Sequence, residues 1–243
     1  MDVGPLAEKI DDELRAAGSP ERAVREKAYL KSALDHYGAT MPVITSIAKA
    51  VRREHPELDH DDLVALGVSL WSRPVHERRM TAAALFELNS QLLDTEDVPL
   101  LERWLRESRT WALVDGIAAS VVVARPPVER RPELRSVLDR WACDDDFWIR
   151  RSALLGLLPG LRQGAGDFER VSRYADSMLD DKEFFIRKAI GWVLRDTAWK
   201  RPGMVFEWLL PPRRTRLRRH AARGPQAALG RAADGGPRRP VKR

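Results

Sequence analysis

Apolar residues recur along most of the chain at every third or fourth position, which is the spacing of one face of an α-helix. No segment shows the strict alternation that a half-buried strand requires. Glycines and prolines fall in the intervals between the periodic stretches and mark their ends. The pattern predicts an all-α protein with helices at 4–16, 20–37, 41–54, 60–72, 75–92, 97–107, 111–124, 131–142, 147–158, 167–179, 184–198 and 203–209.

The helical pattern repeats itself. Trp111, Trp148 and Phe185 are 37 residues apart, and each lies near the start of a long apolar helix. The strings Phe-Trp-Ile-Arg-Arg at 147–151 and Phe-Phe-Ile-Arg-Lys at 184–188 match in register. A period near 40 residues with two helices per unit is typical of a HEAT-type solenoid. An irregular helical bundle with aromatics at coincidental positions is the alternative.

Basic residues recur at similar places in these units. Arg79, Arg151 and Arg187, with Lys188, would line one surface of a solenoid and form a track for duplex phosphates. Each of them could instead be a solvated residue or part of an ion pair between repeats. Three acids, Asp59, Asp97 and Asp146, precede periodic stretches and are expected to cap helices or occupy their first turns.

Charge divides the chain into two parts. The formal net charge of +6 combines −4 for residues 1–210 with +10 for residues 211–243, where ten arginines and Lys242 face one acid. The second part is also rich in proline and glycine, so we expect a helical domain at 1–210 and a largely disordered basic tail at 211–243. Such a tail favours a polyanionic partner.

Composition excludes several classes. The single cysteine, Cys143, rules out an internal disulfide and a cysteine-rich zinc site, and the five histidines show no metal-ligand spacing. Phosphate-binding glycine loops and Gly-x-Ser-x-Gly elbows are missing from the sequence. The acidic start carries no apolar signal core, and no apolar stretch could cross a bilayer. We expect a cytoplasmic protein without metal or cofactor.

Two pairs of residues could carry chemistry. The i,i+4 spacing places Trp111 and Asp115 on one face of a helix, and that face is otherwise apolar. The i,i+3 spacing places Trp192 beside Arg195. Spacing alone favours a structural role for each pair, a half-buried indole beside a residue that satisfies a helix end.

A longer string extends the second pair. Residues 182–196, Lys-Glu-Phe-Phe-Ile-Arg-Lys-Ala-Ile-Gly-Trp-Val-Leu-Arg-Asp, resemble the signature of the DNA alkylation repair family, the AlkD-like alkylpurine DNA glycosylases. Tyr-Leu-Lys-Ser at 29–32, the 111–115 segment and Trp-Ile-Arg-Arg-Ser-Ala at 148–153 match further pieces in the same order. The resemblance spans about residues 8 to 209.

The resemblance implies a solenoid of HEAT-like helix pairs that binds duplex DNA and hydrolyses the glycosidic bond of N3- and N7-alkylated purines without a cofactor. It also implies a monomer associated with the nucleoid through DNA. The catalytic aspartate would be Asp115, with Trp111 and Trp192 near the lesion. DNA contacts would come from Tyr29, Arg151 and Arg195, beside the track residues Arg79, Arg187 and Lys188.

These residue types suit a cationic lesion. An alkylated purine is already a good leaving group, an indole attracts a cation, and a carboxylate stabilises the positive charge that develops on the sugar. Two departures from the family pattern stand out. Leu158-Pro159-Gly160 stands where relatives often have a basic residue shortly after the Arg151 helix, and the chain after Leu210 loses its helical pattern. A catalytically inactive DNA-binding relative and a HEAT-type protein–protein adaptor are the alternative functions.

Overall fold

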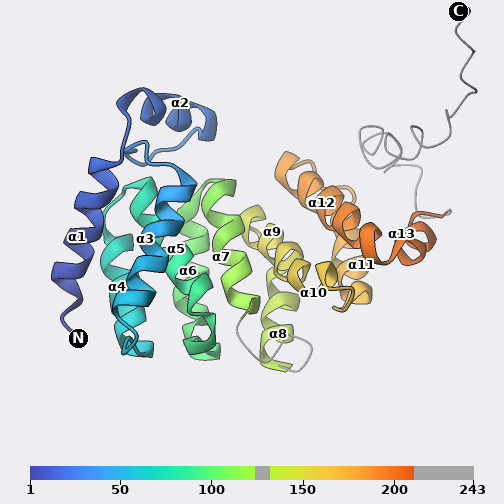
Figure 1. The fold of residues 1–243 in the computed structure, drawn as a ribbon. Coiled ribbons are helices and arrows are strands. Elements are labelled where there is room, and N and C mark those ends of the chain that lie inside the picture. The colour runs from blue at the N-terminus through green and yellow to red at the C-terminus, as the bar shows by residue number, and fades with distance from the viewer. Residues whose placement is uncertain (124–131, 211–243) are drawn as a thin grey trace, which may run out of the picture.

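The computed structural model describes residues 1–123 and 132–210, with the side chains of 119–123 left out, and this part of the chain is helical throughout (Figure 1). Short turns connect the helices, and one isolated bridge joins Asp35 to Val75. The predicted all-α class is confirmed. The helices are α1 (Val3–Ala16), α2 (Pro20–Leu30), α3 (Met41–Glu54), α4 (His60–Ser72), α5 (His76–Leu88), α6 (Val98–Ser108), α7 (Trp111–Val123), α8 (Pro132–Trp141), α9 (Phe147–Gly156), α10 (Leu158–Arg162), α11 (Phe168–Ser177), α12 (Phe184–Lys200) and α13 (Pro202–Leu209).

The helices pack as successive pairs. Helix α4 lies on α5, α6 on α7, and α8 on α9, and the second members form a continuous row in which α5 packs on α7, α7 on α9 and α9 on α12. Helix α3 extends this row at the N-terminal end by packing on α5. Each pair therefore buries its apolar face against its neighbours, as the repeated sequence pattern predicts.

The repeated aromatics lie at equivalent places in this row. Trp111 is the first residue of α7, and Trp148 and Phe185 are the second residues of α9 and α12. The rings of Trp148 and Phe185 are in contact, with centroids 4.9 Å apart. The 37-residue spacing therefore corresponds to one step from a second helix to the next.

Ion pairs join neighbouring repeats. Arg106 pairs with Asp144 at 2.7 Å, and Arg162 pairs with Asp196 at 2.8 Å. The loop acids Asp144 to Asp146 are thus structural, since the Asp146 side chain accepts the Trp148 N–H and caps α9. Asp59 caps α4 in the same way, as predicted.

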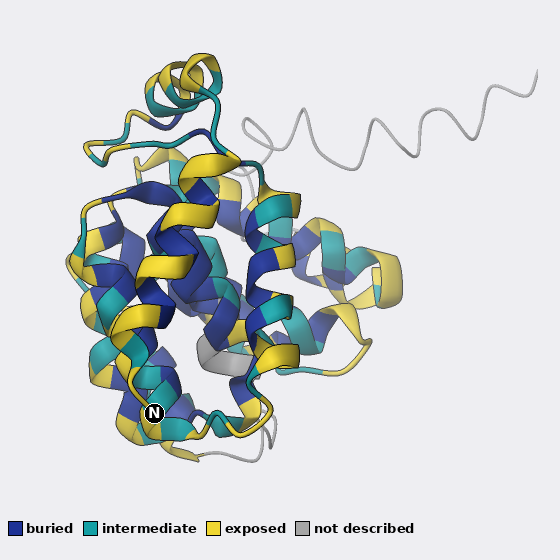
Figure 2. Ribbon diagram, turned by 60° about the vertical axis from the view of Figure 1, so that its left-hand side comes forward, coloured by how far each residue is buried: buried dark blue, intermediate teal, exposed yellow. Residues whose placement is uncertain are grey.

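The core runs between the rows of helices, where Figure 2 shows the buried faces turned toward one another. At its N-terminal end the rings of Trp71 and Trp104 stack at 4.6 Å, and Phe86 packs on Trp104 at 4.9 Å. Gly67 on α4 faces this aromatic group directly. A Cβ atom there would collide with the Phe86 ring and lie 2.9 Å from Trp104.

The helix predicted at 20–37 is shorter than expected. Helix α2 ends at Leu30, because Lys31 adopts a left-handed conformation with φ 49°. The following segment instead makes tertiary hydrogen bonds: the Asp35 N–H donates to the Pro74 carbonyl, and the His76 N–H donates to the Asp35 carbonyl. These long-range bonds outweigh the local helical pattern.

Other boundaries also differ from the prediction. Helix α5 ends at Leu88 rather than at residue 92, and a 3₁₀ turn, Ser90–Leu92, follows it. The Pro159–Gly160 pair, predicted as a break, lies inside the short helix α10, because proline is tolerated in the first turn of a helix. None of the described helices is both long and apolar enough to cross a membrane.

Candidate functional site

The predicted catalytic aspartate lies in an ion pair with the predicted DNA-contacting arginine. Asp115 projects from α7, and Arg151 projects from α9, the next helix in the row. Arg151 Nε donates to Asp115 Oδ1 at 2.8 Å, and Nη2 donates to Oδ2 at 2.9 Å. This two-point geometry fixes the plane of the carboxylate as well as its position.

The pair is buried unequally. The Arg151 side chain is 4% exposed, and its Nη1 donates to the Phe185 carbonyl at 2.6 Å, so three of its nitrogens bind within the protein. The Asp115 side chain keeps 17% of its surface exposed. The carboxylate is therefore the member of the pair that can meet a ligand.

Burial also changes the acidity of Asp115. Loss of solvent raises the pKa of this carboxyl above the usual aspartate value, and the hydrogen bonds and charge of Arg151 oppose that rise. The result is a carboxylate that is poorly hydrated yet held in one orientation. Such a group interacts strongly with positive charge that develops nearby.

One aromatic ring lies a helical turn from this carboxylate, and a second ring contacts the first. Trp111 is one helical turn before Asp115 on α7, half-buried against the core. Tyr29, at the end of α2, approaches it edge-on, with centroids 6.2 Å apart and ring planes at 89°. Tyr29 is 74% exposed, so its ring is accessible from solvent.

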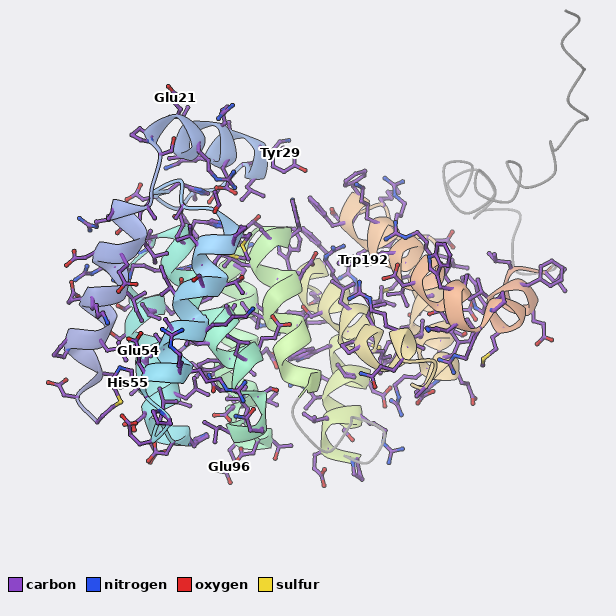
Figure 3. The ribbon with its side chains drawn as sticks, in the orientation of Figure 1. Glu21, Tyr29, Glu54, His55, Glu96 and Trp192 are labelled. Atoms are coloured by element: carbon purple, nitrogen blue, oxygen red, sulfur yellow. The ribbon has the colours of Figure 1, made fainter. Side chains whose placement is uncertain are left out.

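Trp192 belongs to a second cluster, on α12. Its indole N–H donates to Asp196 Oδ2 at 3.0 Å, and the Arg162 guanidinium lies over its ring, 5.5 Å from the centroid. Arg162 also pairs with Asp196. Figure 3 shows Tyr29 on α2, above α7, and Trp192 on α12, to the right of α7 in this view.

The other predicted cations do not form a uniform exposed row. Arg79 is half-buried, with its guanidinium over the Trp71 ring at 4.7 Å, and so packs within the helix pairs. Arg187 is half-buried, and Lys188 is exposed with its amine 5.2 Å from the Phe184 ring centroid. Arg195 is exposed and pairs loosely with Asp196 at 3.3 Å. Their contacts with DNA stay predictions, and Arg151 is engaged with Asp115.

An exact register links several of these residues. Arg79, Asp115, Arg151 and Arg187 follow one another at intervals of 36 residues, one per helix in the row α5, α7, α9 and α12. Asp115 thus holds the one acidic position in a column of arginines. This spacing is the reason that the arginine of one repeat reaches the acid of the preceding one.

Sequence reasoning missed the groups that support Trp192. Asp196 follows Trp192 by four residues, the same interval as Asp115 after Trp111, and that repeated Trp-x-x-x-Asp spacing could have identified it. Arg162 carries no local signal, because it reaches Trp192 from α10 only after folding. The hydrogen bond from Arg151 to the Phe185 carbonyl could not be predicted from the sequence either.

Comparison with known proteins now gives this geometry a context. The family model described as DNA alkylation repair enzyme matches residues 10–232. The chain belongs to this family. The match extends past Leu210 into the basic segment, beyond the resemblance that the sequence motifs showed. A search of curated proteins finds no match.

Solved structures share the fold. A protein from Enterococcus faecalis, described as a predicted DNA alkylation repair enzyme, aligns with a TM-score of 0.71 at 23% identity over 84% of this chain and 95% of its own. AlkD2 from Streptococcus mutans aligns with a TM-score of 0.57 at 18% identity, covering 84% of this chain and 96% of its own. The protein smu.31 from Streptococcus mutans UA159 aligns with a TM-score of 0.52 at 16% identity, covering 90% of this chain and 95% of its own.

The DNA alkylation repair family gives the protein its broad role. It is an enzyme of DNA alkylation repair, and its partner is DNA. The AlkD-type helical-repeat fold predicted from the sequence is confirmed by the solved structures.

Proposed function

We propose that the protein is a DNA glycosylase that hydrolyses the N-glycosidic bond of cationic N3- or N7-alkylated purines in duplex DNA. The observation that carries this proposal is the Asp115 carboxylate, partly exposed and fixed by the two-point pair with Arg151. It is accompanied by an aromatic pair made of the exposed Tyr29 and the half-buried Trp111.

Asp115 would act on the sugar. As the bond between C1′ and the base nitrogen breaks, its electrons go to the base, and positive charge develops on the deoxyribose. A fixed, poorly hydrated carboxylate stabilises that charge without reorganising. The same carboxylate can orient the water that adds to C1′ and accept its proton, which leaves an abasic site.

Trp111, Trp192 and Tyr29 would act on the base. An alkylated purine carries a positive charge, and an aromatic face attracts a cation by about 0.5–2 kcal/mol, depending on how far both are desolvated. The alkyl group removes the need for an acid, because the departing base becomes neutral as it leaves. Burial raises the pKa of Asp115, but the hydrogen bonds and charge of Arg151 oppose that rise, and the proposed reaction uses the carboxylate form rather than the acid.

The proposal predicts selectivity by charge. Purified protein should release 7-methylguanine and 3-methyladenine from methylated duplex DNA, because both leave as neutral bases. It should release uracil or hypoxanthine at least about 100-fold more slowly, since these neutral bases need protonation that the site does not supply. Measuring single-turnover release by chromatography tests this. Equal rates for cationic and neutral lesions would contradict it.

A further inference from the structure

Helix α2 carries Tyr29 but is weakly anchored by apolar contacts. Leu30 is its one buried residue, and Figure 2 shows the helix standing above the rest of the molecule with largely exposed and half-exposed residues. The position of Tyr29 against Trp111 therefore depends on what holds this helix to the row below. A group of polar side chains lies between α2 and α5.

Three potential metal ligands converge there from separate elements. Glu26 comes from α2, His36 from the segment that follows it, and Glu77 from the first turn of α5. One ligand atom from each lies within 4.8 Å of the others. His36 follows Glu26 by ten residues, and Glu77 follows His36 by 41, so no short sequence motif identifies the group.

Three polar atoms of this group lack a hydrogen-bond partner among the described residues. Glu26 Oε2 and both ring nitrogens of His36 are buried without a hydrogen-bond partner in the part of the chain that the structure describes. A buried polar atom without a partner destabilises the folded protein. The other Glu26 oxygen, Oε1, accepts a hydrogen bond from Arg22 at 3.2 Å. This bond fixes the side chain and leaves Oε2 available to bind a metal ion.

Backbone hydrogen bonds hold the Glu77 carboxylate in one orientation. It is fully buried, and its two oxygens accept the backbone N–H groups of Tyr37 and Gly38 at 3.0 and 2.6 Å. Such outer hydrogen bonds commonly orient carboxylates that bind metals. Two carboxylates meet here beside an imidazole. A neutral imidazole retains the lone pair that coordinates a metal.

His76 completes the surroundings. Its ring stacks on His36 with centroids 4.5 Å apart, and it is 3% exposed. Its Nδ1 is likewise buried without a partner among the described residues. Hydrogen bonds among the described residues therefore leave several nitrogen and oxygen atoms of these two imidazoles and two carboxylates without a partner.

We propose that Glu26, His36 and Glu77 bind a divalent transition-metal ion of the zinc class. One imidazole nitrogen and two carboxylate oxygens are ligands that Zn²⁺ accepts, and water can fill the fourth position. The ion tethers α2 to α5. Because Tyr29 lies one helical turn after Glu26, the tether also fixes the aromatic ring that contacts Trp111. The ion has no part in breaking the glycosidic bond.

Titration of the full-length protein with Zn²⁺ tests this site. The protein is first freed of metal with EDTA and dialysed, and every variant carries Cys143→Ser because that exposed thiol is a competing ligand. Calorimetry should show one equivalent bound, and the melting temperature should rise with Zn²⁺ concentration. His36→Ala and Glu26→Gln should each weaken binding at least about tenfold.

The matched control is His55→Ala, which alters an exposed His–Glu pair elsewhere on the surface, formed with Glu57. It should bind Zn²⁺ as tightly as the parent. Circular dichroism of the metal-free variants checks that Glu26→Gln, which keeps the side-chain shape, is folded. The proposal would be overturned if the folded parent failed to bind Zn²⁺. It would also be overturned if His36→Ala and Glu26→Gln bound Zn²⁺ as tightly as the parent.

Discussion

At the scale of single residues, the Asp115–Arg151 pair determines what the site can do. A carboxylate fully exposed to water would be screened by solvent, and one fully buried would be inaccessible to DNA. Asp115 lies between these limits because Arg151 supplies the counter-charge from inside the protein. The arginine therefore acts as a positioning residue for Asp115 in this structure, whatever contact it also makes with DNA.

A pH profile follows from this pair. The proposed reaction needs the Asp115 carboxylate, and burial raises the pKa of that group above the ordinary 3.8, so excision should fall with decreasing pH at a midpoint above 3.8. Arg151→Lys should move the midpoint further up, because lysine keeps the charge but cannot form the two-point pair. Single-turnover rates across pH, corrected for spontaneous depurination, measure both effects.

The neighbouring arginine provides the control for this profile. Arg150 pairs with Asp181 at 2.8 Å and lies on another side of α9. Arg150→Lys should therefore leave the midpoint unchanged. An Arg151→Lys profile that coincides with that of Arg150→Lys would show that the pair does not set the acidity of the reacting group.

At the scale of helices, α4 can approach the aromatic core closely because residue 67 is a glycine, which has no side chain. Gly67→Ala would place a Cβ against Phe86 and Trp104, and these rings are too rigidly packed to move away. We expect a loss of about 1–3 kcal/mol in the free energy of unfolding, measured by urea denaturation.

Gly191 offers a matched comparison inside another helix. A Cβ at Gly191 meets nothing within 4 Å, so Gly191→Ala should stabilise the protein by about 0.5–1 kcal/mol through helix propensity alone. If Gly67→Ala were as stable as the parent, the packing of α4 on α5 and α6 would differ from that described.

Sequence periodicity predicted most helices because each helix has one continuous apolar face. It failed at residues 31–37, where the hydrogen bonds of Asp35 reach residues 74 and 76 and no local pattern reports them. At the site, Trp111 and Asp115 were recognisable by motif. The engagement of Arg151 and the inward packing of Arg79 were not, because both depend on how adjacent repeats meet.

At the scale of the whole molecule, charge is distributed unfavourably for binding DNA without the C-terminal segment. Residues 1–210 carry a formal net charge of −4, and many of their arginines are taken up in ion pairs between repeats. Residues 211–243 carry +10. The long-range attraction of DNA therefore depends largely on that segment.

Deleting residues 213–243 should weaken binding to undamaged duplex of any sequence and reduce the dependence of the binding constant on salt, because fewer counterions are released. Excision at saturating enzyme should stay close to that of the full chain. A variant of full length with the segment's arginines changed to glutamine separates charge from length. If it binds like the parent, the segment contributes by something other than its charge.

The central claim is that Asp115 stabilises the charge formed on the sugar, and Asp115→Asn tests it most directly. The amide keeps the shape and can still accept a hydrogen bond from Arg151 while losing the negative charge. The measurement is single-turnover release of 7-methylguanine from methylated duplex, beside the affinity for undamaged duplex. We predict a loss of rate of at least about 100-fold with affinity nearly unchanged. Release at the parental rate would contradict the account.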